Sequence, residues 1–181
     1  MAKKELGLSF DPIEVAGEHW KTHFGPADSM RVATSIMRAQ QLLLTRYDEL
    51  LRPYGLTFAR YEALVLLGFS RTGELPMRVI GERLMVHPTS ATNIIDRLAK
   101  QGYVSRRPNP ADGRGVLASI TPDGRDVVGN ATKELMAIDF GLDSLDDDQR
   151  GDVFDALRHL RVAAGDFHPE SPPFSSSALP E

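Results

Sequence analysis

The residues best suited to chemistry in this chain are small hydrogen-bonding side chains at the start of one short predicted helix. Pro88 sets the first position of that helix, which the sequence predicts to run to about Gln101, with Gly102 ending it in the left-handed region. Its exposed face presents hydroxyl, amide, acidic and basic side chains: Thr89, Ser90, Thr92, Asn93, Asp96, Arg97 and Lys100. Such a helix start fits the major groove of DNA, where these groups reach base edges.

The residues of this face have different expected partners. Asn93 can form two hydrogen bonds with an adenine, and the hydroxyl residues can contact bases, thymine methyl groups or phosphates. Arg97 and Lys100 lie further along the helix, where backbone phosphates are the expected partners. An amphipathic surface helix without a ligand would show a similar pattern, because serine and threonine also favour helix starts. The helix alone leaves both interpretations open.

A predicted β-hairpin follows directly and favours the DNA-binding interpretation. A strand begins at Tyr103, the Pro- and Gly-rich segment 108–115 reverses the chain, and a second strand returns over residues 116–120. Arg114, between two glycines at the tip, suits a narrow minor groove with its enhanced negative potential. Asp112 forms part of a turn signal and is expected to orient an arginine. The candidates for that arginine are Arg114 or, on the facing strand, Arg106 and Arg107, which are also candidates for DNA contact.

The charge distribution agrees with a DNA-binding module on an acidic body. Residues 78–115 hold seven basic and three acidic side chains, a formal charge of +4, whereas the whole chain carries −4 and the remainder therefore −8. Such an arrangement confines the attraction for phosphates to one region. Chance clustering of charge is the alternative interpretation.

Amphipathic helices on both sides are expected to hold the module. Residues 1–12 are predicted to be a flexible arm, and residues 13–24 and about 28–52 to form two helices with apolar stripes. The second helix, about 25 residues or roughly 37 Å long, would overhang a small domain, which indicates a dimer element. Residues 13–55 are therefore assigned as N-terminal dimerisation helices. Thr57 is predicted to cap a buried helix over 58–69, and residues 73–76 to add a short edge strand to the hairpin.

The C-terminal part begins at Thr121, a predicted N-cap followed by proline. The apolar stripe predicts a helix through Leu142, and a last helix starts at Leu145 or Asp146, so that residues 121–165 complete the dimerisation helices. Residues 166–181, rich in proline and serine, are expected to be disordered. The fold class is mainly α with a small antiparallel β-hairpin, and residues 56–120 form a winged helix-turn-helix.

The chain resembles the MarR (multiple antibiotic resistance regulator) family of winged-helix transcription factors. The resemblance rests on the helix 56–69, the run GERL-x3-P-x-S-AT-x-IIDRLAKQGYVSR, the wing DGR and the ITPDGR that follows it. It implies a homodimer that binds a pseudo-palindromic operator, with residues 88–93 in the major groove, Arg97 on the backbone, and Asp112 and Arg114 in the wing contact. His87 departs from the small capping residue often found there. The resemblance also implies a ligand-responsive regulator, more often a repressor, released from DNA by a small anionic or phenolic effector.

The additional N-terminal helix, which carries Trp20, resembles a helix found in the urate-responsive branch of this family. In that branch a tryptophan on this helix forms the ligand site with arginines and an acid. The resemblance makes Trp20, Arg38 and Glu62 the candidate effector-binding residues. Packing of Trp20 against the dimer helices is the alternative.

Other chemistry finds little support. His19 and His23 have a metal-binding spacing but no third ligand nearby, and 146–148 is a charged helix start without a calcium-loop pattern. The sequence contains no cysteine, phosphate loop or catalytic triad motif, so neither an enzyme nor a cofactor is expected. No signal peptide or long apolar segment is visible, which predicts a cytoplasmic protein without membrane contact. The alternative function is a winged helix that binds protein instead of DNA, although the exposed face lacks the aromatic residues that such a surface favours.

Overall fold

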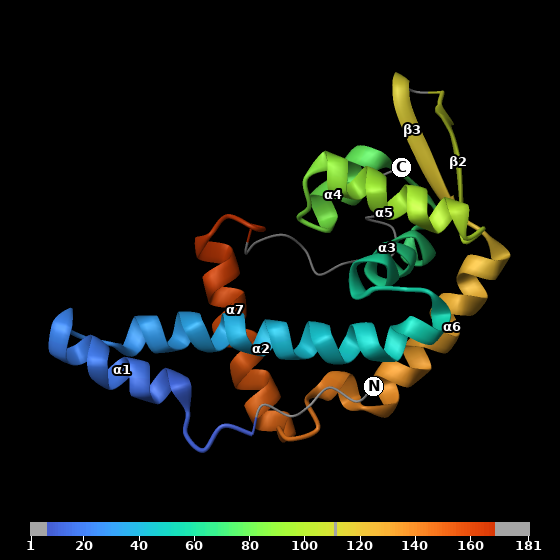
Figure 1. The fold of residues 1–181 in the computed structure, drawn as a ribbon. Coiled ribbons are helices and arrows are strands. Elements are labelled where there is room, and N and C mark those ends of the chain that lie inside the picture. The colour runs from blue at the N-terminus through green and yellow to red at the C-terminus, as the bar shows by residue number, and fades with distance from the viewer. Residues whose placement is uncertain (1–6, 111, 169–181) are drawn as a thin grey trace. The chain divides into compact units, whose positions relative to one another are not determined.

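The structure is a computed structural model that describes residues 7–110 and 112–168 (Figure 1). It divides into two compact units, one up to Thr45 and one from Arg46 onward, and helix α2 (Asp28–Leu51) crosses this boundary. The described residues are mostly helical and contain a small antiparallel sheet of three strands, which confirms the predicted fold class.

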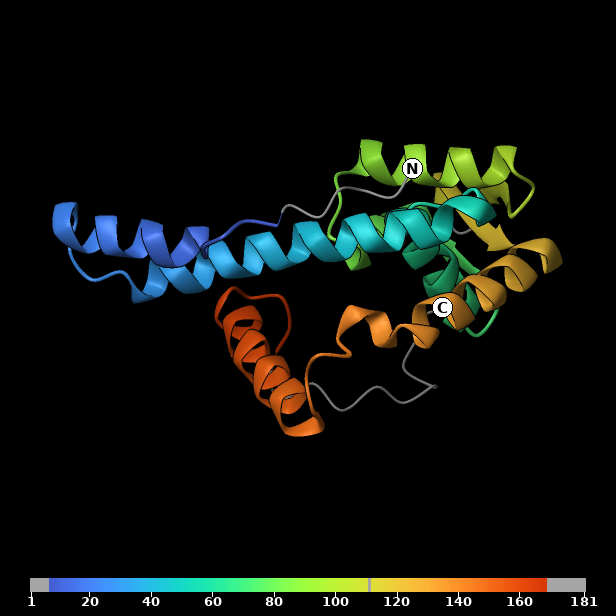
Figure 2. The same cartoon turned by 60° about the horizontal axis from the view of Figure 1, so that its bottom comes forward.

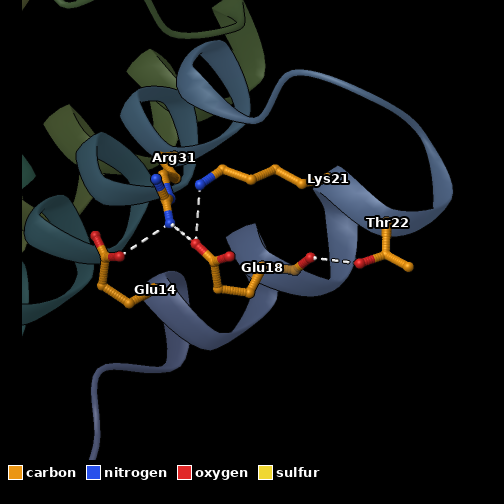
Figure 3. A network of polar contacts seen from close by, with 5 residues as sticks. All are labelled: Glu14, Glu18, Lys21, Thr22 and Arg31. Atoms are coloured by element: carbon orange, nitrogen blue, oxygen red, sulfur yellow. Dashed lines mark hydrogen bonds and ion pairs between the residues drawn. The ribbon is translucent and has the colours of Figure 1, made fainter.

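The first unit is built from α1 (Pro12–His23) and the N-terminal part of α2, which lie side by side (Figures 1 and 2). Asp11 caps α1 by accepting a hydrogen bond from the Ile13 amide at 2.8 Å. Arg31 of α2 donates to Glu14 at 2.9 Å and to Glu18 at 2.8 Å, both on α1 (Figure 3). Gly17 makes room for this arginine, because a Cβ there would lie 2.2 Å from Arg31 Nε.

The second unit contains the predicted winged helix. Helix α3 (Phe58–Phe69) contacts α5 (Pro88–Lys100), and α4 (Met77–Arg83) packs against both α5 and the sheet. The strands β1 (Glu74–Pro76), β2 (Val104–Asn109) and β3 (Asp112–Ile120) are arranged in the order β1-β3-β2. The largest fully buried side chains come mainly from these helices: Leu51, Leu64, Leu67, Ile80, Ile95, Leu98 and Leu135.

The sheet confirms the short edge strand and corrects the limits of the wing loop. β1 pairs with β3 through registers such as Leu75 opposite Ala118. The loop was expected over residues 108–115, but β2 continues to Asn109 and β3 begins at Asp112, with an irregular register at Pro108 and Asn109. The strands therefore extend further toward the tip, because ladder pairing overrides the local turn preference of proline and glycine. Figure 1 shows the β2–β3 hairpin projecting beyond α3, α4 and α5.

The start of α3 also differs from expectation. Thr57 occupies the N-cap position, but its side chain accepts no hydrogen bond from a backbone amide in the first turn of the helix. Asp48 of α2 supplies the cap instead, since its Oδ1 accepts a hydrogen bond from the Phe58 amide at 2.7 Å. The intervening chain turns through η1 (Arg52–Tyr54) and Gly55, whose φ of 68° suits glycine. The cap therefore comes from ten residues upstream.

Helix α6 (Pro122–Ala137) begins as predicted but ends early. The Thr121 hydroxyl accepts a hydrogen bond from the Gly124 amide at 3.0 Å, which confirms the predicted cap. The apolar stripe predicted a helix through Leu142, whereas α6 stops at Ala137 and a short turn, η2 (Asp139–Gly141), follows. Asp139 and Phe140 both have φ of 50°, and the Tyr47 hydroxyl donates to the Phe140 carbonyl at 2.6 Å. This long-range hydrogen bond accompanies the break in the helix.

Helix α7 (Asp147–Ala163) starts with a capping box formed by Asp146 and Gln149. None of its residues is buried. Beyond its end, the cations of Arg158 and Arg161 each lie 5.2 Å from the centre of the Phe167 ring, and Arg161 pairs with Asp166 at 2.7 Å. Residues 166–168 of the predicted disordered tail are thus described, with Asp166 and Phe167 in contact with α7. Residues 169–181 lie outside the described part, as do residues 1–6 of the predicted arm.

Candidate nucleic-acid interface

The start of the recognition helix α5 is fixed by its turn and its cap. Met85 adopts a φ of 52°, and the Val86 amide donates to the Gly81 carbonyl at 3.0 Å. His87 is the N-cap, and its Nδ1 accepts a hydrogen bond from the Thr89 amide at 3.2 Å. The sequence identified His87 as a departure from a small capping residue, and the structure gives it the capping role of the smaller residue.

The polar face of α5 is exposed, as the sequence predicted, whereas Ala91, Ile95 and Leu98 are buried beneath it. The Thr92 hydroxyl donates to the Pro88 carbonyl at 3.0 Å, which uses its single donor within the helix. The other predicted DNA-contacting residues of α5 are all exposed at the surface: Pro88, Thr89, Ser90, Asn93, Arg97 and Lys100.

Basic residues divide into those that have acidic partners and those that do not. Arg106 of β2 pairs with Asp96 of α5, so that the wing is tied to the recognition helix. Within residues 7–110 and 112–168, neither Arg97 nor Lys100 forms a side-chain hydrogen bond or an ion pair. Their charges are therefore available to an external anion.

Arg107 of β2 has a different partner from Arg106. It donates to the two carboxylate oxygens of Glu74 on β1, at 2.5 Å and 3.2 Å, and the Ser119 hydroxyl donates to the same carboxylate at 2.8 Å. The Arg107 guanidinium and the Ser119 hydroxyl hold the pKa of Glu74 below its usual range. Arg107 thus ties β2 to the edge strand across β3, and its side chain stays half exposed.

The wing tip is described only in part. Asp112 is exposed, and its Oδ2 would lie 2.8 Å from a Cβ at Gly115, so glycine leaves room for this carboxylate. Arg106 and Arg107, two of the three arginines proposed for orientation by Asp112, have Asp96 and Glu74 as partners. The side chain of Arg114 lies outside the described residues, so its predicted minor-groove contact stays a prediction.

A hollow beside α5 brings Arg60, which the sequence did not identify, close to the predicted contact residues Asn93 and Arg97. It has a volume of about 430 Å³ and lies between the start of α3 and the middle of α5. We call it the α3–α5 hollow, and its lining residues are Thr57, Arg60, Asn93, Ile94 and Arg97. No local motif marks Arg60, because only the packing of α3 against α5 brings it to the recognition helix.

The three candidate effector residues lie in separate surroundings. Trp20 of α1 is 39% exposed, and its ring centroid lies 5.0 Å from that of Phe24. Arg38 of α2 lines a hollow of about 420 Å³ within the first unit, together with Leu8 and Phe10. Glu62 belongs to the second unit, on the exposed side of α3, and partial desolvation by the surrounding protein raises its pKa. A contact among all three stays a prediction.

The described residues contain no evident metal-binding cluster. Residues 7–110 and 112–168 contain no group of three or more histidine, cysteine or acidic side chains that could hold one. His23 Nδ1 lies 2.8 Å from the His19 backbone carbonyl, a contact within α1. In the same described ranges, no helix combines the length and apolar character that crossing a membrane requires.

Comparison with known sequences identifies relatives of the winged helix. The sequence model of the MarR family matches residues 54–115. The organic hydroperoxide resistance transcriptional regulator of Bacillus subtilis is 34% identical over 79 residues, which are 44% of this chain and 52% of that protein. The HTH-type transcriptional regulator SarZ of Staphylococcus epidermidis is 29% identical over 85 residues, 47% of this chain and 56% of SarZ. The chain thus spans about half the length of the curated relatives it matches.

Solved structures resemble a larger part of the chain. Sco5413, a MarR family transcriptional regulator from Streptomyces coelicolor, is 63% identical to this chain, with a TM-score of 0.73. The matched region covers 77% of this chain and 97% of Sco5413. Sco3205 from the same organism, a MarR family transcriptional regulator solved in complex with DNA, is 26% identical. Its TM-score is 0.69, over 82% of this chain and 94% of Sco3205.

Proposed function

Because the chain belongs to the MarR family of transcriptional regulators, we propose that it acts as a homodimer that binds a pseudo-palindromic operator and represses transcription until a small effector releases it. Two copies of α5 and of the β2–β3 hairpin would meet the two half-sites. The observation that carries this proposal is the exposed α5 face, on which hydroxyl and amide side chains lie beside Arg97 and Lys100, two basic residues without an acidic partner among the described residues. The DNA complex of Sco3205 supports a DNA partner.

The dimer is proposed from the apolar residues that the terminal helices leave uncovered in a single chain. α2 exposes Val32, Met37 and Leu42, and α7 exposes Phe154 and Leu160, each to 55% or more. Large exposed apolar side chains repeated along one helix mark a surface that another protein covers. A second copy of the chain is the proposed partner, since family resemblance implies dimerisation through these helices.

The base-contacting residues are proposed to be those at the start of α5. Pro88, Thr89, Ser90, Thr92 and Asn93 would approach the major groove, where small side chains allow the helix end to enter deeply. Arg97 and Lys100 would contact phosphates. A protein-binding winged helix would favour exposed aromatic residues on α5, and α5 contains none.

The wing is proposed to add contacts of its own. Arg114 would enter the minor groove, with Asp112 beside it in the same strand. Arg106 and Arg107 would approach the backbone while they hold the wing to Asp96 and Glu74.

The effector is proposed to be a small anionic or phenolic compound. The hollow beside Arg38 supports this class, because it combines a cation with the apolar side chains of Leu8 and Phe10; Asp11 also lines it, and its carboxylate accepts a hydrogen bond from the Ile13 amide. Trp20 and Glu62 would complete the effector site, with packing as the alternative role of Trp20.

The proposal is tested by titrating the protein with its own upstream promoter DNA at several salt concentrations, for the wild type and Arg114→Ala. Specific binding predicts that log K falls steeply with log salt and that the promoter binds far more tightly than random duplex. The variant should show a shallower slope where Arg114 replaces counterions at phosphates. Promoter binding no tighter than that of random duplex would contradict a specific regulator.

A further inference from the structure

The α3–α5 hollow is a basic site without an acidic residue in its lining. Thr57 and Arg60 come from the start of α3, and Asn93, Ile94 and Arg97 from α5. Two arginines that face one space repel each other, and an anion between them would offset that repulsion. Thr57 and Asn93 add a hydroxyl and an amide, which can donate hydrogen bonds to the same anion.

Arg60 is held in place by neutral groups. Its Nε donates to the Thr57 hydroxyl at 3.2 Å, and its terminal amino group donates to the Gly55 carbonyl at 2.8 Å. Neither acceptor carries a charge, so these bonds orient the guanidinium and leave its positive charge uncompensated. A guanidinium has five N–H donors, of which these two bonds occupy two.

The Gly55 carbonyl that accepts a hydrogen bond from Arg60 is also bonded to the C-cap residue of the recognition helix. Gln101, next to the end of α5, donates from its side-chain amide to the same Gly55 carbonyl at 2.9 Å. A Cβ at Gly55 would lie 2.6 Å from that amide nitrogen, so glycine permits the close approach. The distance between Arg60 and α5 is therefore fixed before any ligand arrives, which lowers the entropic cost of binding.

Arg97 completes the hollow from the other side. It lies one helical turn after Asn93 on the exposed face of α5 and has no side-chain partner within the described residues. Arg78 and Arg106, in contrast, pair with Glu82 and Asp96. Arg83 of α4 likewise has no partner within the described residues, but of these two arginines it is Arg97 that lines the hollow.

We propose that Arg60 and Arg97 hold one DNA backbone phosphate between them in the α3–α5 hollow, which makes Arg60 a phosphate anchor that fixes how deeply α5 enters the major groove. Arginine suits this role, since its planar fork donates two parallel hydrogen bonds to phosphate oxygens. Contacts of this kind set the register of a protein on DNA without reading its sequence. The inference rests on the proposed DNA-binding function.

The test measures binding to promoter and random duplexes across a salt series for the wild type, Arg60→Gln, Arg60→Lys and Arg97→Gln. Glutamine keeps a donor for Gly55 and removes the charge, whereas lysine keeps the charge. We expect Arg60→Gln to weaken binding to both duplexes by a similar factor, roughly tenfold, and to reduce the salt slope by about 0.9, the value of one phosphate. Arg60→Lys should restore the slope.

A double variant asks whether the two arginines share a phosphate. If they do, Arg60→Gln/Arg97→Gln loses about one phosphate equivalent from the slope, and the two single losses do not add. Loss of about two equivalents would overturn the shared site. Lys133→Gln, which removes an exposed charge on α6, serves as the charge control and should leave the slope unchanged.

Two failures remain distinguishable in this design. If the wild type binds the promoter specifically while Arg60→Gln keeps its affinity and salt slope, the phosphate anchor is wrong and the proposed function stands. If the wild type itself does not distinguish promoter from random duplex, the proposed function fails. Unfolding curves of each variant identify any loss of binding that follows from loss of fold, and failure of Arg60→Lys to restore the slope in a folded protein also overturns the anchor.

Discussion

The winged helix and the terminal helices differ in how they bury apolar side chains. Helix α3 buries four residues and α5 buries three, and the leucine and isoleucine side chains among these seven have zero exposure: Leu64, Leu67, Ile95 and Leu98. Helix α7 buries none, and α1 buries only Gly17. Because hydrophobic burial is the main driving force of folding, the winged helix has a core within one chain, to which α2 and α6 add Leu51 and Leu135, whereas α1 and α7 bury no large apolar side chain. The comparison separates the part proposed to meet DNA from the helices proposed to recruit a second copy.

The largest expected effect comes from removing core volume under the recognition helix. Leu64 of α3 is fully buried, so Leu64→Ala should lower the free energy of unfolding by about 2–5 kcal/mol, through lost burial and the cavity left behind. Urea denaturation with circular dichroism measures this change. A loss below about 1 kcal/mol would show that the winged helix does not depend on this core.

Substitution of an exposed apolar residue on α7 should weaken self-association of the chain and not the stability of its fold. Phe154 is 61% exposed in the single chain, and Phe154→Glu would place a charge in the proposed dimer interface. We expect self-association to weaken by at least about tenfold, equivalent to 1.4 kcal/mol, as measured by sedimentation velocity over a dilution series. The exposed neighbour Asp155, changed to alanine, is the control. An unchanged dimer in Phe154→Glu would place the interface elsewhere.

A smaller effect is expected at the cap of the recognition helix. His87→Ala removes the acceptor of the Thr89 amide and should destabilise the winged helix by about 1 kcal/mol, whereas His87→Asn should keep most of the stability. Chemical denaturation of the three proteins checks this order. Equal stability of the alanine and asparagine variants would mean that the imidazole contributes no cap.

The smallest effect is a pH dependence at Glu62. Desolvation raises the pKa of this carboxyl in the folded state, so the folded protein gains stability from the protonated form and loses it as pH rises through that pKa. Glu62→Gln should therefore stabilise the folded protein at about pH 7 and have little effect on its stability at about pH 4. The gain should stay below about 1 kcal/mol, because the side chain is exposed. Denaturation at both pH values measures the difference, and a destabilised Gln variant at neutral pH would contradict it.

Features encoded by neighbouring residues were predictable from the sequence. The cap at Thr121, the left-handed Gly102, the edge strand 74–76 and the exposed face of α5 all follow from spacing, turn chemistry and periodicity. The predicted end of the helix at Leu142 was wrong, since α6 stops at Ala137. The break is accompanied by a hydrogen bond from the Tyr47 hydroxyl to the Phe140 carbonyl, a long-range contact that the local apolar stripe does not encode.

The candidate site was predictable only on its recognition helix. The partners of Arg106 and Arg107 come from α5 and β1, and Arg60 reaches the interface from α3. These contacts join residues 10 or more positions apart, and a single sequence gives no register for them. The cap of α3 by Asp48 is a similar case, since Thr57 has the expected residue type at the expected position.

The number of protein chains bound to one operator duplex tests the central claim most directly. Native mass spectrometry of the protein with its promoter duplex, compared with a random duplex of the same length, gives this number. A homodimer that places two recognition helices on a pseudo-palindrome predicts two chains on one promoter duplex at concentrations where random duplex stays free. A complex of one chain per duplex, or equal occupancy of both duplexes, would contradict the account.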